Sequence, residues 1–273
     1  DNAVPESLLS LSQKAAFFNV MGTNTGPLTP ASSWYSMMGG STVDYATATR
    51  QTLDSGYIMV GYTYSNITEL QGKAPINPYS FFFDILVVKM NSKGYVEWYT
   101  LLGGAGTEKA YDVQQTADKG FIIVGSSDTA FTTLQGKTPK YPWQNATDML
   151  IIKLDKSGNV SWYSFMGSTG EDEALAVQET TDKGLIIAGY GSAQWNYSVY
   201  GKLPLNNYTG GKDMTVVKLT SSGSLSWYTR LGSTTGDDVA TSVSQIDSAN
   251  GYVVAGYSNA NIPSVGAHTP GNA

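Results

Sequence analysis

The sequence contains no cysteine and only one histidine, His268, in 273 residues. The absence of cysteine excludes disulfide bonds, thiolate catalysis and zinc sites built on sulfur. His268 stands near the C-terminal end among prolines and glycines, which argues against a Ser-His-Asp triad. No glycine-rich phosphate loop precedes a helix. The sequence therefore predicts a protein that is not an enzyme and has no cofactor. A glycosidase using two carboxylates stays open, because spacing along the chain does not report distances between remote segments.

Charged residues and long apolar runs are also scarce. Only 14% of the residues are charged, the net charge is −6 and the pI is near 4.7. No basic stripe is present, which argues against a nucleic-acid partner. No apolar run reaches about 18 residues, so no membrane span is expected. Hydrophobic residues make up 41% of the chain, which excludes a disordered protein.

The remaining composition is typical of an exported protein. The chain has 30 glycines and 18 tyrosines, and it begins with Asp1 rather than Met. We therefore expect an extracellular or cell-surface protein whose signal peptide has been removed. Such a location permits N-glycosylation at Asn-x-Ser/Thr sites, of which the candidates are Asn66, Asn145, Asn196 and Asn207.

An internal repeat dominates the sequence. Trp34, Trp98, Trp162 and Trp227 recur at spacings of 64, 64 and 65 residues, and each precedes a tyrosine. After each tryptophan come a glycine, an acidic residue, a turn containing Asp and Gly, and an apolar run that ends in glycine. A fixed period of this length indicates an architecture built from equivalent units.

Each unit has the pattern of four β-strands. One copy contains "AYDVQQT", "GFIIVGS", "DMLIIKLD" and "NVSWYSFMG". Their β-branched and aromatic residues favour strands. The turns "DKG" and "KSG" suit tight hairpins in which glycine takes a positive φ. A four-stranded antiparallel sheet with two apolar faces needs neighbours on both sides, which a β-propeller supplies.

The copy number predicts an all-β, four-bladed β-propeller of four-stranded antiparallel blades over residues 15–258. Three complete copies begin at Asp44, Glu108 and Asp172, whereas the copy beginning at Asp238 has only two strands. Residues 15–40 match the two missing strands, so we expect the N-terminal segment to complete the last blade. Residues 1–14 form an N-terminal extension, a possible donor segment, and residues 259–273 form a C-terminal tail.

The repeat resembles the SBBP-type repeat of β-propeller surface proteins from bacteria and archaea. The matching motifs are "LLGGAGTEKAYDV", "DKGFIIVGSS" and "DMLIIKLDKSGNVSW", and the resemblance covers nearly all of residues 15–258. It implies a propeller fold and an exported, often cell-surface protein, and it brings no shared catalytic residues. The chain departs from the family in having four copies, where larger rings are more usual.

Repeated residues are candidates for chemistry, but their repetition favours structural roles. A ring of carboxylates at the first strands would be able to hold Ca²⁺, although capping of backbone N–H groups between blades is the favoured interpretation. These residues are Asp44, Glu108, Asp172 and Asp238.

A second acidic set opens the third strands, five residues before a lysine. Odd spacing puts each acid and its lysine on opposite faces, so capping is again expected. These acids are Asp84, Asp148 and Asp213, and the lysines are Lys89, Lys153 and Lys218. The repeated tryptophans are expected to pack between blades rather than to stack on sugars.

The long segments before the third strands are less regular and rich in aromatic residues. They connect equivalent strands, so they should emerge on one side of the molecule. An aromatic loop face suits a protein interface or a glycan-binding surface, and the alternative is that the loops pack on themselves. The candidate contact residues are Tyr64, Tyr79, Trp143, Trp195, Tyr197 and Tyr208.

Two functions fit these observations. The first is an extracellular structural subunit that assembles with itself into a surface filament or layer. Residues 1–14 would then pair with the sheet edge of a neighbour. The alternative is a glycan-binding lectin or adhesin module that uses the aromatic loops, with surface glycans as partners.

Overall fold

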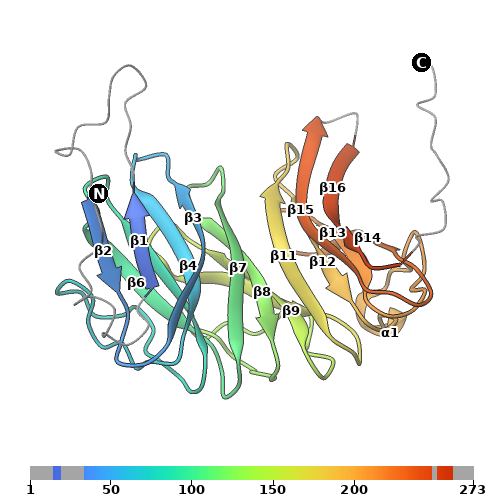
Figure 1. The fold of residues 1–273 in the computed structure, drawn as a ribbon, viewed down its shortest axis with the longest axis horizontal. Helices are drawn as coiled ribbons and strands as arrows, with labels where there is room; N and C mark the ends of the chain where they lie inside the picture. Colours follow the sequence, from blue (N-terminus) through green and yellow to red (C-terminus); the bar gives the residue numbers. More distant parts are fainter. Residues whose placement is uncertain (1–14, 20–33, 248–250, 261–273) are drawn as a thin grey trace, which may run out of the picture.

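The computed structural model describes residues 15–19, 34–247 and 251–260 (Figure 1), and in this part of the chain the fold is all-β. The predicted extension 1–14 and most of the predicted tail lie outside the described residues. The one helix in the described part is a single turn, α1 (Tyr197–Tyr200). The sequence pattern does not predict it, because Asn196 caps its first turn and Gly201 ends it within a loop.

Three four-stranded antiparallel sheets repeat the same strand order, which confirms the predicted unit. Sheet 1 contains β3 (Asp44–Gln51), β4 (Tyr57–Thr63), β5 (Asp84–Met90) and β6 (Val96–Leu102). Sheet 2 contains β7 (Glu108–Gln115), β8 (Phe121–Ser127), β9 (Asp148–Leu154) and β10 (Val160–Met166). Sheet 3 contains β11 (Asp172–Glu179), β12 (Leu185–Gly191), β13 (Asp213–Leu219) and β14 (Leu225–Leu231).

Two further strand pairs flank these sheets. β1 (Ala15–Asn19) pairs with β2 (Trp34–Met38), and β15 (Asp238–Asp247) pairs with β16 (Gly251–Ser258). β1 lies next to β3, whereas β15 packs on the strands of sheet 3, so the two pairs stand at opposite ends of the row of sheets (Figure 1). Among the described strands they form separate two-stranded sheets. The expected completion of the last blade by residues 15–40 of the same chain is therefore not present.

The sheets pack on one another through their first strands. Side chains from β3, β7, β11 and β15 line one cavity of about 710 Å³, the axial cavity, so the four first strands face a common space. The tryptophan of each fourth strand packs on the next sheet: Trp98 contacts Phe121, and Trp227 contacts Tyr252. The predicted packing role is confirmed for Trp98, Trp162 and Trp227, whereas the Trp34 side chain lies outside the described part of the structure.

The two kinds of hairpin turn differ in where the positive φ falls. Gly94, Gly158 and Gly223 before the fourth strands have φ of 82°, 86° and 81°, as predicted. In the first hairpins of sheets 1, 2 and 3 the expectation was wrong, because the residue before the glycine takes the left-handed conformation, as Lys119 does with φ of 67°. In the β15–β16 hairpin it was right, because Gly251 has φ of 85°. Gly120 is needed there for another reason. A Cβ at that position would collide with the Lys153 ammonium group and a backbone carbonyl.

Candidate functional site

The seven acidic residues that open the first and third strands are buried and cap backbone N–H groups. Glu108 accepts the Gly104 N–H at 2.7 Å, and Asp84 accepts the Ser80 N–H at 2.6 Å. Asp172 accepts the Ser168 N–H at 2.7 Å. The capping interpretation is therefore confirmed. No group of three or more His, Cys, Asp or Glu side chains arranged for a metal ion occurs within the described part of the chain.

The acidic caps also meet in pairs where one sheet joins the next. The carboxylates of Asp84 and Glu108 approach each other over Gly103, where a Cβ would collide with both. Asp148 and Asp172 meet in the same way over Gly167. Burial raises the pKa of Asp84 to about 6 and that of Glu108 to about 7.

Asp148 is a buried acid whose pKa is raised well above its ordinary value. Its side chain is fully buried, and its Oδ1 has no hydrogen-bond partner among the described residues. Burial, together with the neighbouring Asp172 carboxylate, raises its pKa to about 8. At neutral pH this carboxyl is therefore largely protonated, and it is able to donate its proton toward Asp172.

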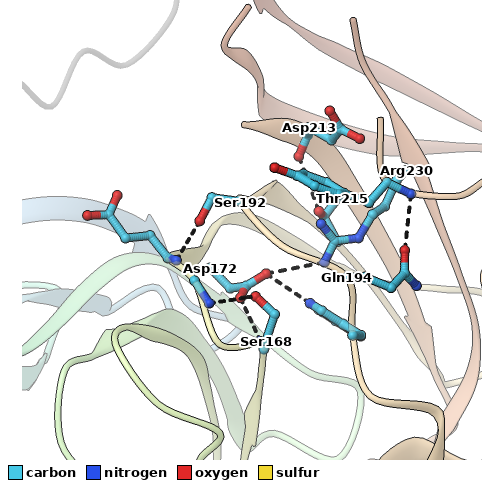
Figure 2. Close-up of polar contacts among 12 residues, drawn as sticks. Ser168, Asp172, Ser192, Gln194, Asp213, Thr215 and Arg230 are labelled. Atoms are coloured by element: carbon cyan, nitrogen blue, oxygen red, sulfur yellow. Dashed lines mark hydrogen bonds and ion pairs between the residues drawn. The ribbon is translucent and has the colours of Figure 1, made fainter. Parts of the chain in front are cut away.

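Besides the buried lysine that all three sheets share, sheet 3 contains a buried arginine, Arg230 (Figure 2). Arg230 on β14 places Nη2 3.3 Å from Asp172 Oδ1, and both side chains are 0% exposed. The guanidinium carbon lies 5.4 Å from the centre of the Trp195 ring and 5.6 Å from that of Tyr208. Burial raises the pKa of Asp172, and the Arg230 charge opposes that rise.

Arg230 is a residue that the sequence analysis missed. Leu101 and Phe165 occupy the corresponding positions of sheets 1 and 2, and both are buried and apolar. An arginine where the other copies carry apolar residues is a break in the repeat. That break was the available signal, because a buried charge needs a partner.

The six aromatic candidates fall into two groups. Tyr64 and Tyr197 are 44% and 57% exposed. Trp195 is only 2% exposed; it donates to Asp172 Oδ1 at 2.8 Å and stacks on Tyr228. The loops thus pack partly on themselves, and a contact role for the exposed members stays a prediction.

The other three candidates are half-buried. The hydroxyl of Tyr79 donates to the Phe82 carbonyl, and that of Tyr208 donates to the Gly211 carbonyl at 3.0 Å. Trp143 packs against the core between sheets 1 and 2. The four candidate glycosylation residues, Asn66, Asn145, Asn196 and Asn207, are all exposed.

The most unusual surface of the molecule is the outward face of β16. Each of β4, β8 and β12 carries an isoleucine at the second position of the repeated apolar run. This side chain packs on the first strand of the next sheet and is 0% exposed. The three residues are Ile58, Ile122 and Ile186. The equivalent residue of β16, Val253, is 54% exposed, and Tyr257 on the same face is 57% exposed. β16 therefore presents an apolar face without the next sheet that covers its counterparts.

A matching uncovered face lies at the other end of the molecule, on β3. Ala46 is exposed, whereas its equivalents Ala110, Ala174 and Ala240 are all 0% exposed beneath the preceding sheet. Thr49 is also exposed on this strand. The two ends of the row of sheets thus carry the two complementary halves of a sheet junction.

The β1–β2 pair is positioned as the outer half of a sheet that would precede sheet 1. Met38 at the end of β2 is 2% exposed and packs with Met59 and Leu86 of sheet 1. Its equivalent in sheet 1, Leu102, packs with Phe121 of sheet 2 in the same way. β1–β2 therefore lacks two inner strands, and β15–β16 lacks two outer strands.

No protein-family model matches the chain, and no curated protein matches it either. The resemblance to SBBP-type repeats therefore stays a prediction. Across residues 15–19, 34–247 and 251–260, no helix has the length and apolar character needed to cross a membrane.

Proposed function

We propose that the protein is an exported, non-enzymatic structural subunit that assembles with copies of itself into a filament or layer. In this assembly β1–β2 of one copy completes the sheet begun by β15–β16 of the next copy. Each completed four-stranded sheet then lies between sheet 3 of one copy and sheet 1 of the other copy, so each copy adds four sheets to the assembly. The observation that carries the proposal is the 54% exposure of Val253, because its three equivalents are fully buried.

The repeat predicts the register of this contact. Trp34 pairs with Asn19 as Trp98 pairs with Lys89, so β1–β2 matches β5–β6 residue for residue. β4 pairs with β5 through Val60 and Val87. By the same register, Ala255 of β16 is expected opposite Phe17 of β1, and Val254 opposite Phe18.

Physical arguments favour completion of this kind. An uncovered strand edge offers unpaired backbone groups to another chain. Burial of a valine or tyrosine side chain on such an edge contributes about 1.5–3 kcal/mol. Because the donor pair and the acceptor pair lie at different ends of the subunit, the contact is head-to-tail. A head-to-tail contact that does not close on itself produces a filament.

Cysteine cross-linking tests the proposal, since the chain has no cysteine of its own. Directly opposed residues on antiparallel strands have Cβ atoms about 4.5–5.5 Å apart, near the range that a disulfide spans. A mixture of the single variants Phe17→Cys and Ala255→Cys should form a mixed disulfide-linked dimer under oxidation. The double variant should form a ladder of polymers on non-reducing gels.

The control replaces Ala255→Cys with Leu53→Cys, because Leu53 is 76% exposed on the hairpin between β3 and β4 and takes no part in the expected β16–β1 pairing. This mixture should not give a specific dimer with Phe17→Cys. A double variant that becomes a cross-linked monomer at every concentration would show that the chain closes its own ring. That result, or the absence of any cross-link, would overturn the proposal. Light scattering of the unmodified protein should show polymers if the proposal holds and monomers if it does not.

A further inference from the structure

The axial cavity lies at the end of the molecule opposite the aromatic loops. Its walls come from the C-terminal halves of the first strands and from the hairpins that follow them, whereas the loops join the sheets where those strands begin. Its volume of about 710 Å³ is within the size range of small-molecule sites. It is accordingly a surface distinct from both the loop face and the open faces of β3 and β16.

Two glutamine side chains present oriented donors to this cavity. Gln114 Oε1 accepts the Glu179 N–H at 2.5 Å, and Gln178 Oε1 accepts the Gln245 N–H at 2.6 Å. Because a backbone N–H must be accepted by the amide oxygen, these bonds fix the orientation of each side-chain amide and the position of its nitrogen. Within the described residues neither amide nitrogen has a hydrogen-bond partner, and each nitrogen carries two N–H donors.

The cavity also contains the residues that break the repeat on the first strands. Arg50 stands where sheets 2 and 3 have glutamine, and Asp112 stands where sheets 1 and 3 have alanine. Arg50 Nη2 lies 2.7 Å from Asp112 Oδ1 across the junction of sheets 1 and 2. Both departures from the repeat line the cavity, which points to a role particular to the cavity.

The charge balance of the walls selects the kind of ligand. Arg50 and Asp112 compensate each other, and Glu179 adds one negative charge, which disfavours anions. The amide nitrogens and Arg50 are donors, which disfavour a metal ion. Val177 and Val243 line the cavity with the small exposed part of their side chains, 7% and 8%, and add a narrow apolar patch. Donors, one carboxylate acceptor and an apolar patch together suit a neutral molecule that has many hydroxyls and one C–H face.

We infer that the axial cavity is a binding site for a neutral saccharide of one or two rings. Gln114 and Gln178 donate to its hydroxyl oxygens, and Glu179 accepts from a hydroxyl. The site lies within a single copy and does not depend on the pairing of β1–β2 with β16. The cross-linking experiment and the binding experiment are therefore able to fail separately.

Isothermal titration with a panel of glucose, galactose, mannose, N-acetylglucosamine, maltose and lactose tests the inference, with glucuronate as the charged counterpart. At least one neutral sugar should bind, and glucuronate should bind more weakly. Gln178→Glu keeps the oxygen that accepts the Gln245 N–H but removes the amide donors. It should weaken sugar binding roughly tenfold.

Gln135→Glu is the matched control. Gln135 also accepts a backbone N–H, from Val160 at 2.8 Å, but it lies in an outer loop away from the axis. Binding by this variant should equal that of the unmodified protein, and circular dichroism should confirm that both variants are folded. The inference is overturned if no sugar of the panel binds, or if folded Gln178→Glu binds as tightly as Gln135→Glu.

Discussion

Transfer of the protein from pH 8 to pH 5 is expected to increase its stability by about 4 kcal/mol or more. For a chain of this size that corresponds to a rise in Tm on the order of 10 °C. The effect comes from the fully buried acids at the sheet junctions. Burial raises the pKa of Asp84 to about 6, of Glu108 to about 7 and of Asp148 to about 8.

The sign follows from proton linkage. Because the folded protein binds these protons more tightly than the unfolded chain does, the contribution is fully present below the ordinary carboxyl pKa near 4. It is lost as the pH rises toward 8. Hydrogen bonding to Thr180 and the nearby Lys218 ammonium hold the pKa of Asp182 at about 2, so the contribution of Asp182 disappears below pH 4. The stability optimum is therefore expected near pH 4–5, as measured by thermal unfolding in matched buffers.

Asp148→Asn removes the contribution of the acid whose pKa is raised to about 8. Its oxygen would keep the Gln144 N–H, and its amide nitrogen would replace the unpartnered Oδ1 and donate toward Asp172. Asp172 and the Tyr200 hydroxyl are the titratable groups beside it. We expect a higher Tm at pH 8 and a flatter profile between pH 5 and 8.

Glu69→Gln is the control for this substitution. The exposed Glu69 carboxylate accepts the Gly72 N–H at 3.2 Å and lies outside the acidic pairs. The pH profile of this variant should keep the slope of the unmodified protein. If the stability of Asp148→Asn changes between pH 5 and 8 as steeply as that of the control variant, the buried pair of Asp148 and Asp172 does not cause the pH dependence.

Arg230→Leu is expected to destabilise the protein by about 3–5 kcal/mol at pH 7. Leucine occupies the corresponding position of sheet 1, so the shape of the site is preserved. What is lost is the charge that compensates Asp172, whose side chain is 0% exposed. Urea unfolding followed by circular dichroism measures the loss.

Two further variants separate charge from packing. The double variant Arg230→Leu/Asp172→Asn removes the uncompensated charge and should recover most of the lost stability. Arg50→Leu breaks an ion pair whose arginine side chain is 51% exposed, so it should cost about 1 kcal/mol or less. Equal losses in Arg230→Leu and Arg50→Leu would contradict the proposed importance of burial.

The sequence was sufficient for features that recur in every copy. Four strands per unit, glycine with positive φ before the fourth strand, acidic caps and packing tryptophans were all predictable, because each follows from a local pattern seen three or four times. Asp84 shows the limit of such patterns. Its capping role was predictable, but its approach to Glu108 over Gly103 was not, because spacing along one strand says nothing about the neighbouring sheet.

Features that occur once were harder to predict. Arg230 differs from Leu101 and Phe165 at a single position, and only its three-dimensional surroundings reveal the carboxylate that it faces. The separation of β1–β2 from β15–β16 was also unpredictable. The sequence shows that the two pairs complement each other, but the same local contacts would form within one chain or between two.

The composition of the β3 face has a mechanical consequence for an assembled thread. Thr49 stands where the internal junctions bury Val113, Val177 and Val243. In the proposed assembly the seam between copies would therefore be more hydrated than the seams within a copy. Under tension such a thread would part between subunits before any subunit unravelled. Because each broken end would keep an intact donor or acceptor hairpin, the severed pieces would be able to rejoin.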